Sequence, residues 1–286
     1  DIRQDSRIHS KVFYEIFKKA LKNKFPKDYT TLKESQKIKI LDKIQSIELS
    51  GDDFNDTIVK NTIESIIAMK TIQNSNGEKA CHRYIISNNQ SAINILEVFS
   101  MFKLCGWTDL TVDIVPLFET IDDLNVCKDV METVYNNKKY RNHLEKRGNV
   151  QTIMLGFSDG TKDGGYLTAN WSILKAKESL TKISRKYGIK VIFFDGRGGP
   201  PARGGGNTHQ FYSALGNLVE SEQIQLTVQG QTISSNFGTI DSSQYNLEQL
   251  ISSGVKNKII SDKEIFTATH RRTLNKLSEI SYKSYS

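Results

Sequence analysis

The spacing of apolar residues along the chain changes near residue 80. Before that point, apolar residues recur every three or four positions and polar residues, many of them lysine, separate them. This spacing predicts amphipathic helices, which we expect over residues 8–25, 35–49 and 54–73. Residues 1–80 are therefore expected to form a mostly helical segment.

From residue 81 onward, short apolar runs alternate with longer stretches of helical spacing. The runs cover residues 83–88, 112–119, 152–159, 190–196 and 224–230. Short apolar runs separated by helices are typical of buried parallel strands joined by crossover helices. The helices between them are expected over residues 91–106, 122–146, 167–188 and 208–221. We therefore predict an α/β fold and treat residues 81–286 as its β/α segment.

Three of the predicted strands end in charged residues. Glu119 ends one run, Asp159 ends the next, and Asp195 and Arg197 follow the apolar residues of a third. In parallel β/α folds the ligand site lies at the carboxyl ends of the strands, so these side chains are expected on one shared surface. Two carboxylates there suit Mg²⁺ or Mn²⁺. The alternative is that Asp159 caps the following helix and Glu119 pairs with a lysine.

A glycine-rich stretch, VIFFDGRGGPPARGGG, begins in the fourth of these runs. It places Arg197 and Arg203 in a segment that can fold over a ligand, and guanidinium groups bind phosphate or carboxylate through paired hydrogen bonds. Its glycines are Gly196, Gly198, Gly199, Gly204, Gly205 and Gly206. An RGG-type nucleic-acid segment and a plain flexible loop are the alternatives. Lys162 could bind phosphate beside the first turn of a helix, or be an ordinary surface lysine.

Composition limits the functional classes. The chain of 286 residues carries a net charge of 39 − 32 = +7 and has no apolar run long enough to span a membrane. Its three cysteines form neither a CxxC pair nor a metal-binding spacing, which favours reduced thiols in the cytoplasm. Because the first residue is Asp1, we expect a processed chain or a piece of a longer protein.

Five motifs occur in an order that resembles the phosphoenolpyruvate carboxylase family. They are DIRQDS (1–6), VPLFETIDDL (115–124), MLGFSDGTKDGG (154–165), FFDGRGGPPARGGGNTH (193–209) and TVQGQTI (227–233). The resemblance implies a partial TIM-type (β/α)8 barrel with additional α-helices and about five to six parallel strands. Residues 1–4 would end one of these strands and the rest of 1–80 would be a helical insertion, within one incomplete domain.

The resemblance also implies an activity. Family members are carbon–carbon lyases that carboxylate phosphoenolpyruvate with bicarbonate, giving oxaloacetate and phosphate through carboxyphosphate and an enolate. They require Mg²⁺ or Mn²⁺, act in the cytoplasm, supply the tricarboxylic acid cycle and form homo-oligomers. We expect no nucleic-acid or membrane partner and little activity from this chain alone. A non-catalytic anion-binding or scaffold module, and an RNA-binding protein, are the alternatives.

Residue roles carry over position by position. By similarity, Glu119 and Asp159 would hold the metal, Arg3 and Lys162 would contact phosphoenolpyruvate, and Arg197 and Arg203 would bind bicarbonate and phosphate. One position departs from the family. The glycine loop of the family usually begins HGRGG, whereas this chain has Asp195 in place of the histidine. A carboxylate cannot act as an imidazole donor near neutral pH, so the role of this position is open.

Overall fold

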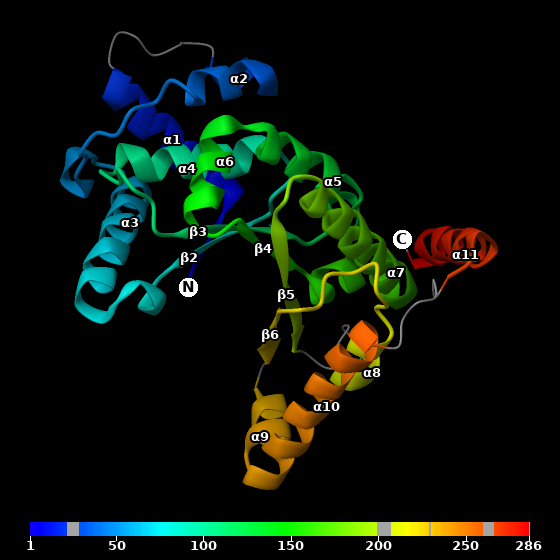
Figure 1. The fold of residues 1–286 in the computed structure, drawn as a ribbon. Coiled ribbons are helices and arrows are strands. Elements are labelled where there is room, and N and C mark those ends of the chain that lie inside the picture. The colour runs from blue at the N-terminus through cyan, green and yellow to red at the C-terminus, as the bar shows by residue number, and fades with distance from the viewer. Residues whose placement is uncertain (22–28, 199–206, 229, 260–265, 286) are drawn as a thin grey trace. The chain divides into compact units, whose positions relative to one another are not determined.

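The strands of the protein follow one another across the sheet in chain order. The computed structural model describes residues 1–21, 29–198, 207–228, 230–259 and 266–285. Within these ranges, six strands form one sheet in the order β1 to β6 (Figure 1). They are β1 (Ile2–Asp5), β2 (Arg83–Ser87), β3 (Asp113–Phe118), β4 (Val150–Leu155), β5 (Lys190–Gly198) and β6 (Ile224–Val228).

The sheet topology is that of a β/α barrel. The pairs β1/β2, β2/β3 and β5/β6 are parallel. Each strand from β1 to β6 is followed by at least one helix. Strands in sequential order, joined by helices, are the arrangement of a (β/α)8 barrel rather than of a doubly wound sheet, whose order reverses. The predicted fold class, a partial barrel with additional helices, is confirmed.

The chain divides into two compact units. Unit 1 comprises Asp1–Leu117 and Val130–Gln151, and unit 2 comprises Phe118–Asp129 and Thr152–Ser286. These units do not coincide with the expected segments, residues 1–80 and 81–286. That division of the chain stays a prediction. The helices of unit 1 are α1 (Ser6–Leu21), α2 (Glu34–Leu41), α3 (Thr57–Asn76), α4 (Ala92–Leu104) and α6 (Lys138–Lys146), and α5 (Ile121–Asn136) begins in unit 2 and ends in unit 1.

Unit 1 is built around α4, which is apolar along almost its whole length. Helices α1 and α2 pack against it, and α1 also contacts α3. The rings of Phe13, Phe17 and Tyr29 form one aromatic cluster with centroids 5.1–5.7 Å apart. Glu97 of α4 is buried and accepts hydrogen bonds from Tyr29 Oη at 3.0 Å and Ser10 Oγ at 2.9 Å. Because burial disfavours a carboxylate, it raises the pKa of Glu97.

Unit 2 contains the longest helix, and that helix is kinked. Helix α7 (Phe157–Lys186) is interrupted at Gly165, which has φ 75° and ψ 166°. The kink separates a short first segment from the long amphipathic segment that the sequence predicted. The other helices of this unit are α8 (Thr208–Ser213), α9 (Gln231–Phe237), α10 (Ile240–Ile259) and α11 (Ala268–Tyr285).

Polar contacts hold α11 against α7. Thr168 Oγ1 donates to the carbonyl of Ser278 at 3.0 Å, and Trp171 Nε1 donates to Asn275 Oδ1 at 2.8 Å. The guanidinium of Arg271 makes two hydrogen bonds, of 2.7 and 2.8 Å, to the carboxylate of Glu178. On the face of α7 toward α11, Trp171 is buried, whereas Leu167, one turn earlier, is exposed.

Two predicted helices differ from the structure. The helix expected over 35–49 ends at Leu41, because Ser46 Oγ and the Ile47 amide both bond to the carbonyl of Lys103 instead of continuing the helix. The helix expected over 122–146 is two helices. Asn137 divides them, since its side chain accepts from the Tyr140 amide and caps α6.

Candidate functional site

The carboxyl ends of β3, β4 and β5 lie against one another within unit 2. The amide of Gly156, directly after β4, donates to the carbonyl of Phe118 at the end of β3 at 2.9 Å. A Cβ on Gly156 would lie 3.1 Å from the Cα of Glu119, and one on Gly196 would lie 3.1 Å from the carbonyl oxygen of Leu155. Side chains at these two glycines would push the strand ends apart, so glycine permits the close approach.

Glu119 is fixed by the start of α5. The carboxylate of Asp123 accepts from the amides of Glu119 at 3.3 Å and Thr120 at 3.0 Å, while Thr120 Oγ1 accepts from the Asp123 amide at 3.1 Å. These reciprocal bonds cap the helix. The carboxylate of Asp163, in the first segment of α7, accepts from the Ile121 amide at 2.9 Å. The start of α7 is thereby joined to the backbone that carries Glu119.

Asp159 lies in the first turn of α7. Gly156 and Gly160 lie on either side of Asp159 in the sequence. A Cβ added at either glycine would lie within 3.4 Å of an atom of Glu119. Asp159 Oδ1 accepts from Lys162 Nζ at 3.0 Å, and the two side chains are 49% and 59% exposed. Such an exposed pair contributes only about 0–1 kcal/mol and is readily exchanged for other partners.

Arg197 projects from an irregular part of β5. The register of β5 against β6 shifts between Asp195 and Gly198, so three steps of β5 oppose two of β6. Bulges of this kind re-aim side chains and are frequent next to active sites. Arg197 is buried, and its guanidinium carbon lies 4.2 Å from the centroid of the Phe211 ring in α8. Burial lowers the pKa of Arg197, but a guanidinium remains protonated at neutral pH.

Asp195 is completely buried and belongs to a polar cluster that the sequence did not predict. Its Oδ2 accepts from Lys177 Nζ and from Tyr212 Oη, both at 2.7 Å. Lys177 is 1% exposed at its side chain and lies in the long segment of α7. Desolvation lowers the pKa of Lys177, and burial together with the nearby carboxylate raises the pKa of Tyr212.

The remaining predicted site residues lie elsewhere or outside the described ranges. Arg3 is on β1 in unit 1, next to Ile85 of β2, with an exposed side chain. Gly198 is the last residue of β5. Outside the described residues lie Arg203, Gly199, Gly204, Gly205 and Gly206.

The donor chemistry at the strand ends suits a divalent cation. Glu119 and Asp159 supply two carboxylates on adjoining strand ends, and Mg²⁺ is commonly held by one or two carboxylates with water and substrate phosphate. Among the described residues, no group of three or more His, Cys, Asp or Glu side chains is placed to hold a metal ion. The two-carboxylate set is compatible with Mg²⁺, and metal binding by it stays a prediction.

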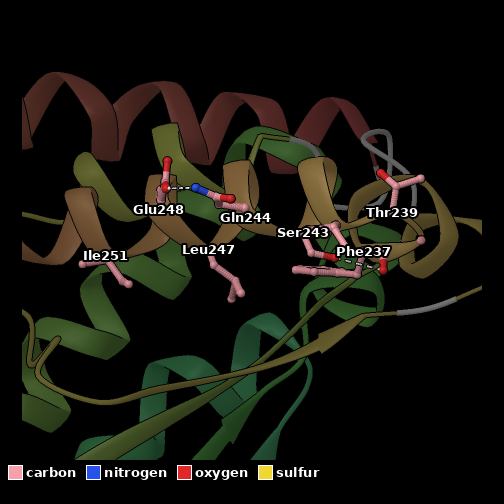
Figure 2. A pocket seen from close by; sticks show the side chains of 9 residues that line it. Phe237, Thr239, Ser243, Gln244, Leu247, Glu248 and Ile251 are labelled. Atoms are coloured by element: carbon pink, nitrogen blue, oxygen red, sulfur yellow. Dashed lines mark hydrogen bonds between the residues drawn. The ribbon is translucent and has the colours of Figure 1, made fainter.

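A separate pocket in unit 2 has a different character. It has a volume of about 540 Å³ and lies over α10 and the end of α9 (Figure 2). Phe237, Leu247 and Ile251 line it, and Glu248 accepts a hydrogen bond from Gln244 at 2.7 Å. None of the predicted site residues that the structure describes lines it. Its described lining has one carboxylate and no cation, which does not suit a phosphorylated anion.

Comparison with known proteins decides the family. The family model described as phosphoenolpyruvate carboxylase matches residues 1–286, the whole chain. The chain belongs to the phosphoenolpyruvate carboxylase family. It is 35% identical over 295 residues to a phosphoenolpyruvate carboxylase of Nitrosomonas eutropha, covering 100% of this chain and 32% of that protein. It is also 35% identical over 270 residues to the phosphoenolpyruvate carboxylase of Nitrosomonas europaea, covering 91% and 29% respectively.

The chain spans about a third of the length of the curated relatives it matches. The motifs at β3, β4 and β5 lie at strand ends whose backbones adjoin one another in unit 2. Their individual roles in binding and catalysis stay predictions.

Several residues of the candidate site were missed by sequence reasoning. Asp123 gave a usable signal, because an acidic residue close to a helix start often caps that helix. Lys177 and Tyr212 gave none. Lys177 lies in a lysine-rich helix, AKESLTKISRK, where a solvated surface position is the ordinary expectation.

Proposed function

We propose that the protein containing this chain carboxylates phosphoenolpyruvate with bicarbonate and releases oxaloacetate and phosphate. The observation that carries the proposal is that, in a member of this family, the carboxyl ends of β3, β4 and β5 adjoin one another, and Glu119, Asp159 and Arg197 lie at or just after these ends. Phosphoenolpyruvate and bicarbonate are both anions, so they react only where cations offset their charge. The site offers Arg197 and Lys162 for this purpose.

Glu119 and Asp159 would hold a Mg²⁺ or Mn²⁺ ion, which when bound would neutralise charge on the phosphate and on the enolate oxygen. Asp159 would leave Lys162 for this role, at little cost because their pair is exposed. The ammonium group of Lys162 would then be available to the phosphate of the substrate. Binding of the metal ion by Asp159 would thus free the Lys162 ammonium group to bind the substrate.

The bond changes follow from the proposed substrates. A bicarbonate oxygen attacks phosphorus, the bond between phosphorus and the enol oxygen breaks, and carboxyphosphate and the pyruvate enolate form. Carboxyphosphate divides into CO₂ and phosphate, and the enolate carbon bonds to CO₂. Arg197 would stabilise the phosphoryl oxygens during transfer, while the glycine loop and Arg203 would exclude water that would otherwise protonate the enolate.

The cellular setting is proposed on the same basis. We propose a cytoplasmic lyase that replenishes the tricarboxylic acid cycle and acts as a homo-oligomer. Cys81, Cys105 and Cys127 are buried free thiols, which favours a reducing compartment. Among the described residues, every helix is too short or too polar to cross a bilayer.

The test is bicarbonate-dependent oxaloacetate formation by the full-length protein with Mg²⁺. Arg197→Ala and Asp159→Asn are expected to abolish it, because each removes a charge that the reaction needs. Arg185→Ala and Asp122→Asn, exposed positions on α7 and α5, are matched controls expected to keep it. Near-normal turnover in either site variant would contradict the proposed roles.

A second measurement separates catalysis from plain anion binding. Mg²⁺ and phosphoenolpyruvate together should raise the thermal midpoint of the wild-type protein, because a ligand that binds only the folded state stabilises it. Stabilisation without any oxaloacetate formation would favour the alternative of a non-catalytic anion-binding module. Salt-dependent affinity for RNA, without phosphoenolpyruvate binding, would favour the RNA-binding alternative.

A further inference from the structure

The reaction proposed above uses Arg197 but not the buried residues Asp195, Lys177 and Tyr212, which form one cluster with it. Lys177 and Asp195 form an ion pair of 2.7 Å whose side chains are 1% and 0% exposed. Desolvating two charges is costly, and buried pairs of this kind are often no more stabilising than apolar residues of the same size. Stability alone is therefore a weak reason for this pair.

The cluster is arranged around Phe211, and Arg197 is part of it. Lys177 Nζ lies 5.4 Å from the centroid of the Phe211 ring, and the guanidinium carbon of Arg197 lies 4.2 Å from it. The ammonium of Lys177 also lies 4.9 Å from the Phe193 ring and 5.6 Å from that of Tyr212. One ring thus adjoins both cations, so a change of charge at Lys177 or Asp195 is felt at Arg197 through a medium that screens poorly.

The charge of the cluster depends on Lys177. The pair of Lys177 and Asp195 has a net charge of zero whichever partner holds the shared proton, and Tyr212 is neutral. The cluster therefore has the single positive charge of Arg197. Without the lysine, the carboxylate would cancel that charge and would itself be a partner for the guanidinium. In the described residues the hydrogen bonds of Asp195 run only to Lys177 and Tyr212, through Oδ2, and Oδ1 has none.

We infer that Lys177 is a positioning residue that neutralises Asp195, so that the buried end of β5 presents the positive charge of Arg197 to an anionic substrate. The identity of that substrate, phosphoenolpyruvate or bicarbonate, rests on the proposed function. The inference also accounts for a carboxylate where the family usually has histidine. Asp195 is tolerated beside the reacting anions because a buried lysine accompanies it.

The test uses charge-changing variants whose effects have opposite signs. Lys177→Gln keeps a hydrogen-bond donor toward Asp195 but lowers the cluster charge from +1 to 0. We expect it to raise the Kd for inorganic phosphate and the KM for bicarbonate in the full-length protein about ten-fold, as loss of one charge in a partly buried site predicts. Asp195→Asn leaves a cluster charge of at least +1, so both constants should stay within about two-fold of wild type or fall.

The double variant Lys177→Gln/Asp195→Asn has the wild-type cluster charge and should restore phosphate affinity to within about two-fold. Lys175→Met, two residues earlier on α7, is the matched control for loss of a lysine and should change neither constant. Circular dichroism monitors folding. If Lys177→Gln does not fold, a ten-fold loss of phosphate affinity in the folded double variant would overturn the inference.

Equal weakening of phosphate binding by Lys177→Gln and Asp195→Asn would show that both act only through packing, and would also overturn it. So would a wild-type protein that binds no phosphate. A wild-type protein that binds phosphate but forms no oxaloacetate contradicts the proposed function instead, and the phosphate affinities of the variants still decide the role of Lys177.

Discussion

Two lysine–aspartate pairs of unit 2 have the same chemistry and different surroundings. Both lysines belong to α7. Lys162 meets Asp159 at 3.0 Å with side chains 59% and 49% exposed, and Lys177 meets Asp195 at 2.7 Å with side chains 1% and 0% exposed. Water screens the first pair and stabilises its separated members. The pair of Lys177 and Asp195 is not solvated by water. Removing either residue would therefore leave the other charged group in an apolar setting without its ion-pair partner.

The difference assigns the pairs to different tasks. An exposed pair exchanges partners at little cost, which suits side chains that must bind a metal ion and a substrate in turn. A buried pair does not exchange, which suits a fixed contribution to the local charge. The distance between the charged atoms, similar in both, does not distinguish them.

The largest expected effect is on the buried pair. Lys177→Met should lower the free energy of unfolding by about 3–5 kcal/mol, because it leaves the Asp195 carboxylate buried without the ammonium group that pairs with it. Urea denaturation followed by circular dichroism measures the loss. The double variant Lys177→Met/Asp195→Asn should recover much of it. A single variant as stable as wild type would show that the pair is solvated in solution.

His9 is buried and forms no ion pair among the described residues. Its titration therefore measures the cost of burying a charge in the absence of a paired counter-charge. Burial lowers the pKa of His9 to about 4, from about 6.5 in the unfolded chain. Between these values the unfolded chain binds a proton that the folded chain excludes, so stability falls as the pH is lowered from 6.5 toward 4. The loss should reach about 3 kcal/mol. His9→Gln should reduce this pH dependence but not remove it, because burial also lowers the pKa of His143 to about 4. A slope unchanged from wild type would contradict the lowered pKa of His9.

A half-buried pair should give an intermediate effect. Arg271 and Glu178 join α11 to α7 through two hydrogen bonds, with side chains 26% and 17% exposed. Arg271→Lys keeps the charge but cannot form both bonds at once, so it should cost about 1 kcal/mol. Thermal unfolding provides the measurement, with Arg272→Lys as the neighbouring control. If Arg271→Lys lowered the free energy of unfolding as much as Lys177→Met, the docking of α11 on α7, rather than burial of the ion pair, would determine the size of the loss.

The smallest effect on stability is expected at the exposed pair. Lys162→Met should change the free energy of unfolding by less than about 1 kcal/mol, the usual range for exposed ion pairs. Under the proposed function it should nevertheless reduce oxaloacetate formation strongly, because the ammonium group is needed by the substrate. A substantial loss of stability, seen in the same urea experiment, would remove the contrast between the two pairs.

Much of the fold followed from the sequence. The period of the apolar residues predicted the parallel strands and most crossover helices, since burial of one face requires that period. It failed where a tertiary contact replaced a local one. Residues 42–49 have helical spacing, but the carbonyl of Lys103 captures the backbone there. Helices α9, α10 and α11, which follow the last run, were not predicted.

The candidate site also has residues that the sequence predicted and contacts that it did not. Glu119, Asp159 and Arg197 could be named from the sequence, because each directly follows or ends an apolar run and strand ends converge in this topology. The cap formed by Asp163 on the Ile121 amide joins residues 42 positions apart in the chain, and no local pattern reveals it.

The chain alone determined which residues are apolar, where strands end and which charges follow them, since these depend on local order and periodicity. Only the tertiary structure decided the environment of each charge. Lys162 and Lys177 are the same residue type on the same helix, 15 positions apart. One faces water and the other faces Asp195 and three aromatic rings. Solvation is a property of everything packed around a group, and that packing brings together segments that the sequence keeps apart.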